Sequence, residues 1–190
     1  MREFLEDADL VATAADGNQE AFTSLVKAYR GYIYALAYRV VLNVDDALDV
    51  TQNVFLKLAH KIGQFNGKGS FRAWLAVVTT REAIDYGRRS FHRELATEPE
   101  DLALLAEKRG SQSIANPREH LEAHQRLEQV EAAMTSLSRQ QRAILALRLR
   151  EDMGPKEISK NLGISARQVR VQLHRAIAKV RKKVMRNEQA

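Results

Sequence analysis

The sequence predicts an all-α protein of two small helical domains joined by a flexible linker. Apolar residues recur at spacings of three and four along most of the chain, and no useful stretch alternates as a strand would. Only 9 Gly and 3 Pro interrupt the 190 residues, which leaves room for long helices. The periodicity weakens at residues 95–122, where Pro, Gly, Ser and acidic residues gather. We therefore expect domains at residues 1–94 and 123–186, with an acidic linker at 95–122.

The charge distribution supports the same division. Residues 1–94 hold 12 Lys+Arg against 12 Asp+Glu, whereas residues 139–186 hold 14 against 3, a net charge of +11. A compact basic segment behind a neutral half indicates a polyanion-binding module attached to a domain with another role.

Several function classes find no support in the sequence. The chain has no cysteine, which excludes disulfides, thiolate metal sites and cysteine nucleophiles. His120 and His124 are four residues apart but lack a third ligand at a motif spacing, so we expect no metal site. No phosphate-binding glycine motif or activated nucleophile is recognisable, and we expect neither an enzyme nor a cofactor. No apolar run approaches the roughly 18 to 20 residues of a membrane span, and we expect a cytoplasmic protein without membrane contact.

Glycine and capping residues delimit the helices of the first domain. A first helix stops near Gly17, and Asn18 is suited to cap the second. Asp45 or Asp46 starts a third helix, which ends at Gly63 after an acidic first turn that the helix dipole favours. After the loop "QFNGKGS", Ser70 can cap a fourth helix that runs through "RRSFHR". The second helix carries its apolar residues at helical spacing: Ala21, Phe22, Leu25, Val26, Tyr29, Ile33, Leu36 and Ala37.

The third helix has two distinct faces when residues 45–62 are placed at 100° per residue. One face is apolar and consists of Ala47, Leu48, Val50, Val54, Phe55, Leu58 and Ile62. The other face, which we call the acidic face, consists of Asp45, Asp46, Asp49, Gln52, Asn53 and Leu56. It is suited to a basic partner helix. Thr51 falls on the apolar side, where its hydroxyl can bond the carbonyl four residues earlier.

Residues 154–183 have the order of a helix-turn-helix, preceded by a helix over "SRQQRAILALRLRE". Pro155 suits a first helical turn, Gly163 supplies the tight turn and Ser165 caps the next helix. The inward stripe of that helix is Val169, Leu173, Ile177 and Val180. Its outward face is Arg167, Gln168, Arg170, Val171, His174, Arg175 and Lys179. Because Arg and Gln can contact guanine and adenine edges bidentately, DNA binding is favoured over a hairpin with a merely solvated basic face.

Two long stretches carry a family resemblance. "DALDVTQNVFLKLAHKIGQFNGKGSFRAWLAVVTTREAIDYGRRS" and, after the linker, "LSRQQRAILALRLREDMGPKEISKNLGISARQVRVQLHRAIAKVRKKV" resemble the extracytoplasmic function (ECF) group of bacterial sigma-70 factors. The resemblance covers about residues 8–92 and 125–184. It implies a transcription-initiation subunit without catalytic residues. The first domain would bind the clamp helices of the largest polymerase subunit and open the −10 promoter element. The second would read the −35 element and lie against the polymerase flap.

The resemblance also implies roles for individual residues. The acidic face would contact the clamp, and the outward helix-turn-helix face would read the −35 element. The −10 surface would consist of Phe65, Asn66, Lys68, Ser70, Phe71, Arg72, Trp74, Arg81, Arg88 and Arg89. Aromatic rings can stack on bases, and arginines can follow the phosphates. For Trp74, in "FRAWLAVV", a core position is favoured over direct base contact.

The chain departs from the family pattern at three positions. Glu82 stands where the family has an Asn that helps to read the −10 element. Leu48 and Asn53 stand where the family has acids, so the acidic face is depleted in charge. This depletion resembles a subgroup in which a Ser/Thr kinase supplies the charge, since a phosphate adds about −1.5 to −2. Phosphorylation of Thr51 as a switch for polymerase binding and burial of Thr51 in the core both stay open.

A helix-turn-helix regulator that is not a polymerase subunit is the alternative. Such a protein would bind duplex promoter DNA by itself and would carry a helical ligand- or partner-binding domain. The combination of the acidic face with "FRAWL" and "DYGRR" favours the sigma factor. The sequence leaves open the promoter, the kinase, any anti-sigma factor and whether the two domains pack together.

Overall fold

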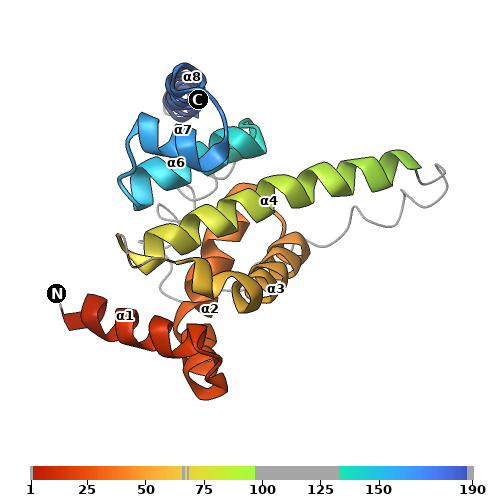
Figure 1. Cartoon of the computed structure of the whole chain (residues 1–190). Helices are drawn as coiled ribbons and strands as arrows, with labels where there is room; N and C mark the ends of the chain where they lie inside the picture. Colours follow the sequence, from red (N-terminus) through yellow and green to blue (C-terminus); the bar gives the residue numbers. More distant parts are fainter. Residues whose placement is uncertain (1, 66, 68, 97–132, 188–190) are drawn as a thin grey trace, which may run out of the picture.

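The computed structural model describes residues 2–65, 67, 69–96 and 133–187, and every regular element within these ranges is helical, as predicted. The expected linker and most of the expected helix "LEQVEAAMTSL" lie outside them. None of the described helices is both long and apolar enough to cross a membrane. The elements are α1 (Arg2–Ala15), α2 (Gln19–Val41), α3 (Val44–Lys61), the 3₁₀ turn η1 (Ile62–Gln64), α4 (Phe71–Ala96), α6 (Arg139–Arg150), α7 (Pro155–Leu162) and α8 (Ala166–Asn187) (Figure 1).

In the first domain, α1 to α4 pack around one apolar core. Asn18 caps α2 as predicted, because its side chain accepts a 2.9 Å hydrogen bond from the Ala21 N–H. Asn43 caps α3 in the same way, so this helix begins at Val44, slightly earlier than predicted. The prediction had taken the first acid as the start and passed over an asparagine that caps equally well. Fully buried side chains of this core are Leu25, Ile33, Val50, Val54, Leu58 and Leu75.

The second domain has the predicted helix-turn-helix. Gly163 adopts φ +67° at the end of α7, the left-handed conformation that ends a helix with least strain in glycine. The prediction that Ile177 faces inward was wrong, since it is 46% exposed and Ala176 is buried in its place. Seven residues after Val169 a helix has returned to within about 20° of the same direction, whereas eight residues overshoot by about 80°.

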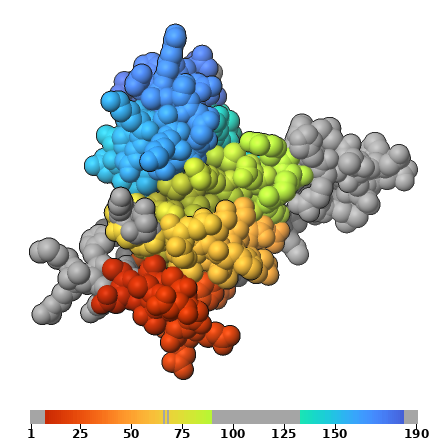
Figure 2. Space-filling model, in the orientation of Figure 1, coloured from red at the N-terminus to blue at the C-terminus, as the bar shows by residue number. Residues whose placement is uncertain are grey.

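The two domains pack against each other through a shared apolar core. Figure 2 shows the second domain lying directly on the surface of α4, and Figure 1 shows α6 and α7 beside that helix. The buried residues of this shared core come from both domains: Leu36, Ala76 and Val77 from the first, and Ile144, Ala146, Leu147, Met153, Ile158 and Val169 from the second. The sequence had left this packing open.

Candidate functional site

The acidic face of α3 is largely exposed, as its sequence predicts. Asp45, Asp49, Gln52 and Leu56 are exposed, and Asp46 and Asn53 are half-buried. Leu48 was expected on the buried side, but it is 48% exposed. Leu48 lies at the edge of the apolar face of α3. The core beneath this helix is already filled by Ala47, Val50, Thr51, Val54 and Leu58.

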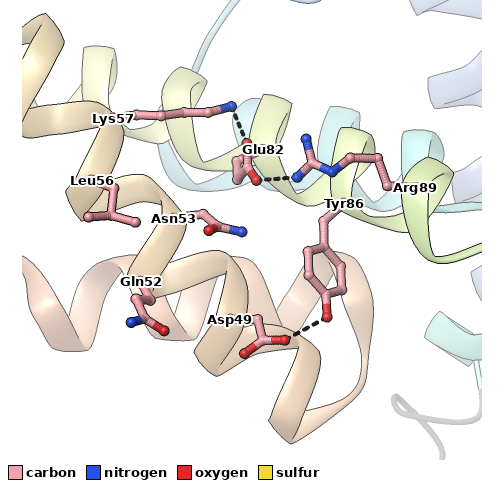
Figure 3. Close-up of a pocket in the computed structure, with 8 residues that line it drawn as sticks. All are labelled: Asp49, Gln52, Asn53, Leu56, Lys57, Glu82, Tyr86 and Arg89. Atoms are coloured by element: carbon pink, nitrogen blue, oxygen red, sulfur yellow. Dashed lines mark hydrogen bonds and ion pairs between the residues drawn. The ribbon is translucent and has the colours of Figure 1, made fainter. Parts of the chain in front are cut away.

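A hollow of about 850 Å³ lies between α3 and α4 (Figure 3). Four residues of the acidic face line it: Asp49, Gln52, Asn53 and Leu56. Glu82 stands at its base with only 1% of its side chain exposed. Its carboxylate accepts hydrogen bonds from Lys57 and, at 2.6 Å, from Arg89. On the other side of the hollow the Tyr86 hydroxyl donates a 2.7 Å bond to Asp49. Because a buried carboxylate is costly without partners, Glu82 fixes both cations and ties α3 to α4.

The burial of Glu82 changes what this departure from the family pattern means. The Glu82 side chain lies at the bottom of the hollow, where it has almost no exposed surface with which to contact a nucleobase. Glu82 instead forms an ion pair with Arg89, whose side chain is half-exposed. Arg88, one residue earlier in α4, is exposed. Of the two arginines expected to follow DNA phosphates, Arg89 already forms an ion pair with the Glu82 carboxylate.

The aromatic residues expected beside the −10 element pack on one another. The ring centroids of Phe65 and Phe71 are 5.4 Å apart, and Phe71 stacks on Trp74 at 5.6 Å. Phe71 is buried and also contacts Tyr29, so its ring is not free to stack on a base in this arrangement. These contacts support the core position favoured for Trp74. Ser70 is half-buried before α4, and Asn66 and Lys68 lie outside the described residues.

Arg72 and Arg81, two other residues of the expected −10 surface, contact the second domain. The Arg72 guanidinium lies 4.1 Å from the Tyr32 ring centroid and 3.7 Å from the Glu151 carboxylate. The Tyr32 hydroxyl donates a 2.6 Å hydrogen bond to Glu151. Burial, and then this bond, raise the pKa of Tyr32 well above its ordinary value. The Arg81 Nε–H donates to the Asn161 carbonyl in α7.

The outward face of α8 is exposed at every predicted position: Arg167, Gln168, Arg170, Val171, His174, Arg175 and Lys179. Two of these side chains also have a partner within the domain. Gln168 Oε1 accepts a 2.8 Å bond from the Ser165 N–H, and Ser165 Oγ accepts from the Gln168 N–H, which together form a capping box. The Lys179 ammonium donates to the Ser136 carbonyl at 3.2 Å. The remaining side chains of this face form a basic surface suited to a DNA groove.

Sequence reasoning missed three residues between the domains: Gly87, Arg139 and Arg142. Arg142 is 7% exposed, and its guanidinium donates 2.6 Å bonds to the carbonyls of Val40 and Leu137. Burial, with a smaller contribution from Arg139, lowers the pKa of Arg142 to about 10. Arg139 crosses α4 at Gly87 and reaches Asp46 at 3.8 Å. The glycine within an otherwise unbroken helix was the available signal.

Thr51 is 6% exposed, and its hydroxyl donates a 2.6 Å hydrogen bond to the Ala47 carbonyl. This is the geometry of a core threonine. No cluster of three or more metal-ligating side chains occurs in the part of the chain that the structure describes. His120 and His124 lie outside that part.

Two sigma-70 families match the chain: region 2 at residues 25–91 and region 4 at residues 127–180. The chain is 30% identical to the RNA polymerase sigma factor CnrH of Cupriavidus metallidurans, over 92% of this chain and 93% of that one. It is 31% identical to a probable RNA polymerase sigma factor, RfaY, of Xanthomonas campestris, over 90% of this chain. It is 30% identical to the ECF RNA polymerase sigma factor SigE of Mycolicibacterium smegmatis, over 88%. The chain spans only 42% of the length of RfaY and 64% of that of SigE.

The fold is similar to that of CnrH in complex with the cytosolic domain of CnrY, with a TM-score of 0.59. In this comparison of structures the sequence identity is 24%, and the similarity covers 94% of this chain and 96% of CnrH.

Proposed function

Because the chain belongs to the ECF group of the sigma-70 family, we propose that it is an alternative sigma factor that directs core RNA polymerase to specific promoters. A sigma factor is a non-enzymatic polymerase subunit, so its chemistry is recognition. The observation that carries the proposal is the presence on one chain of an exposed acidic helix face and an exposed basic helix-turn-helix face. As a polymerase subunit the protein would act in the cytoplasm.

The polymerase contact is assigned to the acidic face of α3. Asp45, Asp49 and Gln52 offer carboxylate and amide groups, and Leu56 offers apolar surface, all accessible to a basic helix of the polymerase clamp. Exposed Leu48 enlarges the apolar part of this surface. Complementary charge of this kind accelerates association and selects the partner, and buried apolar anchors supply most of the affinity.

The promoter contacts are assigned to two surfaces. The outward face of α8 would enter the major groove at the −35 element, with Arg167, Arg170 and Arg175 as the principal donors. At the −10 element, Arg88 and the glycine loop before α4 are accessible, and Gly67 and Gly69 have the positive φ angles of a tight loop. A loop pocket that holds a flipped base offsets an unstacking cost of a few kcal/mol.

A more specific hypothesis is that phosphorylation of Thr51 regulates polymerase binding. The buried position of Thr51 argues against it, because a kinase needs the hydroxyl in an extended, accessible segment, and a phosphate cannot be accommodated in the core. Modification would therefore require local unfolding of α3. Charge depletion at Leu48 and Asn53 is the remaining argument for a switch. A Ser/Thr kinase stays a candidate partner on that ground alone.

The experiment that tests the function is run-off transcription with purified core RNA polymerase and a library of genomic promoters. Promoter-specific transcripts from the wild-type chain are expected, and an Asp45→Asn, Asp49→Asn double variant should lose them while it still binds duplex DNA. Transcripts that appear only after kinase treatment, and are absent in Thr51→Ala, would support the switch. If no preparation yields transcripts although duplex DNA is bound, the protein is a helix-turn-helix regulator.

A further inference from the structure

Glu82 is a buried negative charge in α4, the helix that also carries Arg88 and Arg89. Its carboxylate is only 1% exposed, and each oxygen accepts a hydrogen bond from a different cation. Oε2 accepts from Lys57 on α3, and Oε1 accepts from Arg89 on α4 at 2.6 Å. Figure 3 shows both cationic groups directed toward this carboxylate at the hollow. Glu82 therefore determines where the charged group of Arg89 lies.

The periodicity of α4 explains why Arg89, and not Arg88, reaches this carboxylate. Seven residues bring a helix back to within about 20° of the same direction, so Arg89 lies on the face of α4 that carries Glu82. Long side chains in a helix lean toward its N-terminus, which directs the Arg89 guanidinium back to Glu82. Arg88 points about 100° away around the helix and is exposed. Of two adjacent arginines, one faces the buried carboxylate and the other faces away from it.

The burial of Glu82 makes its pair with Arg89 costly to break. Ion pairs between exposed side chains contribute little, because water stabilises each partner once the two separate. Water cannot do this for a carboxylate that is 1% exposed, so the departure of Arg89 would leave a buried charge with one partner fewer. A DNA phosphate must therefore compete with Glu82 for Arg89, whereas Arg88 faces away from this carboxylate and bears no such cost.

We propose that Glu82 is a positioning residue that withholds Arg89 from promoter phosphates and so limits the sequence-independent part of the affinity for DNA. This inference rests on the proposed function and deepens it, because it assigns the phosphate contact near the −10 element to Arg88 and not to both arginines. Phosphate contacts strengthen binding to every sequence alike, whereas contacts with base edges discriminate between sequences. Glu82 acts on the first kind of contact through Arg89.

The test is the salt dependence of DNA binding by the full chain assembled with core RNA polymerase, from about 50 to 200 mM salt. Two fragments are compared, a promoter found by run-off transcription and the same fragment with its −10 sequence scrambled. Glu82→Gln keeps the size of the side chain and removes its charge. It should make the slope of log affinity against log salt steeper by about 0.7 to 0.9 on both fragments, the value of one added phosphate contact. The control Glu20→Gln removes the same charge from an exposed position at the start of α2 and should leave the slope unchanged.

Variants of the two arginines identify the cation that Glu82 withholds. In the otherwise unchanged chain, Arg88→Gln should make the slope shallower by about 0.7 to 0.9, and Arg89→Gln should change it by less than about 0.3. In the Glu82→Gln background, Arg89→Gln should remove the slope that Glu82→Gln had gained, a non-additive effect that assigns the gain to Arg89. Equal losses of slope in Arg88→Gln and Arg89→Gln would overturn the proposal, because Arg89 would then already contact a phosphate. That comparison does not depend on how Glu82→Gln folds.

Sequence preference distinguishes this role from base recognition. Glu82→Gln should tighten binding to the native and the scrambled fragment by the same factor, about twofold to fivefold at low salt. If it instead changes the ratio of the two affinities and leaves the salt slope unaltered, Glu82 contacts a base and the proposal is refuted. A chain that does not assemble with core polymerase contradicts the proposed function. The free chain then still tests the inference, because the salt slopes of the same variants can be compared on a single-stranded oligonucleotide.

Discussion

At the scale of single residues, the buried charged groups do most to define the arrangement of this molecule. Glu82 holds Lys57 and Arg89, and Arg142 joins three carbonyls from both domains. Each group would be destabilising in an apolar core without these partners. Each therefore specifies which surfaces come together, beyond any contribution to stability.

Arg142→Lys should lower the free energy of unfolding by about 2 to 3 kcal/mol. A single ammonium group cannot reach all three carbonyls that the Nε–H and Nη1–H groups of the planar guanidinium contact, so buried acceptors are left without donors. Urea denaturation followed by circular dichroism measures the change. The control is Arg148→Lys, whose half-exposed side chain pairs with exposed Asp152. It should change the free energy by less than about 0.5 kcal/mol, and equal effects of both variants would contradict the assignment.

Two substitutions of Thr51 distinguish the effect of packing on stability from the effect of charge. Thr51→Val should change the free energy of unfolding by no more than about 1 kcal/mol, because within the described part of the chain its hydroxyl bonds the Ala47 carbonyl, which the helix already satisfies. Thr51→Glu should cost at least about 3 kcal/mol, since it places a carboxylate in the core. Thermal unfolding compares the two variants. A stable Thr51→Glu chain would show that this position can move to the surface.

At the scale of helices, caps determine where each element begins. Asn18, Asn43 and Ser138 each accept a hydrogen bond from the first turn of the helix that follows. Gln168 has two tasks, because it completes the capping box of α8 and also lies on the face expected to read DNA.

Gln168→Glu should separate these two tasks. Glutamate also completes a capping box, so the free energy of unfolding should stay within about 0.5 kcal/mol of the wild type. DNA binding should weaken, because an acid replaces an amide beside the phosphates. Gln168→Ala should lose about 0.5 to 1 kcal/mol of stability as well. Chemical denaturation and a duplex-binding titration measure the two effects. Equal stability losses in both variants would contradict the capping role.

At the scale of the whole molecule, the packing of the two domains buries groups that each domain alone would expose. Tyr32 is the clearest case. It lies on α2 and packs against the core that the two domains share, and its hydroxyl donates to Glu151 of the second domain. The pKa of this hydroxyl therefore depends on whether the two domains are packed together.

Tyr32 should make the free energy of unfolding fall as the pH rises above about 10, whereas Arg142, whose pKa is lowered to about 10 in the folded chain, acts in the opposite direction. The folded chain keeps the Tyr32 proton because its pKa is raised above the ordinary value of 10.0, whereas the unfolded chain releases it. The unfolded state then binds fewer protons, and the free energy of unfolding decreases with pH. Glu151 enhances the effect, and Arg72 and Arg150 oppose it. Urea denaturation between pH 9 and 11 should show a steeper decrease in wild type than in Tyr32→Phe. Parallel curves would contradict this burial.

Much of the fold and part of the candidate site could be predicted from the sequence. Helical periodicity, Asn18 and the Gly163 turn predicted the helices because these signals act within one or two turns of the chain. The positions of Leu48 and Ile177 were predicted wrongly. Each lies near the margin of a helical face, where the burial of a side chain depends on the neighbouring helix and cannot be read from the helix alone.

The sequence by itself determined the helical class, the helix-turn-helix, the acidic face of α3 and the family resemblance. Only the tertiary structure decided that the domains pack together, that Glu82 is buried between two cations, and that Arg139 crosses Gly87 to reach Asp46. The physical reason is distance along the chain. Periodicity and capping depend on residues three or four positions apart, whereas Arg139 and Asp46 are 93 positions apart and meet only through the packing of helices that lie between them in space.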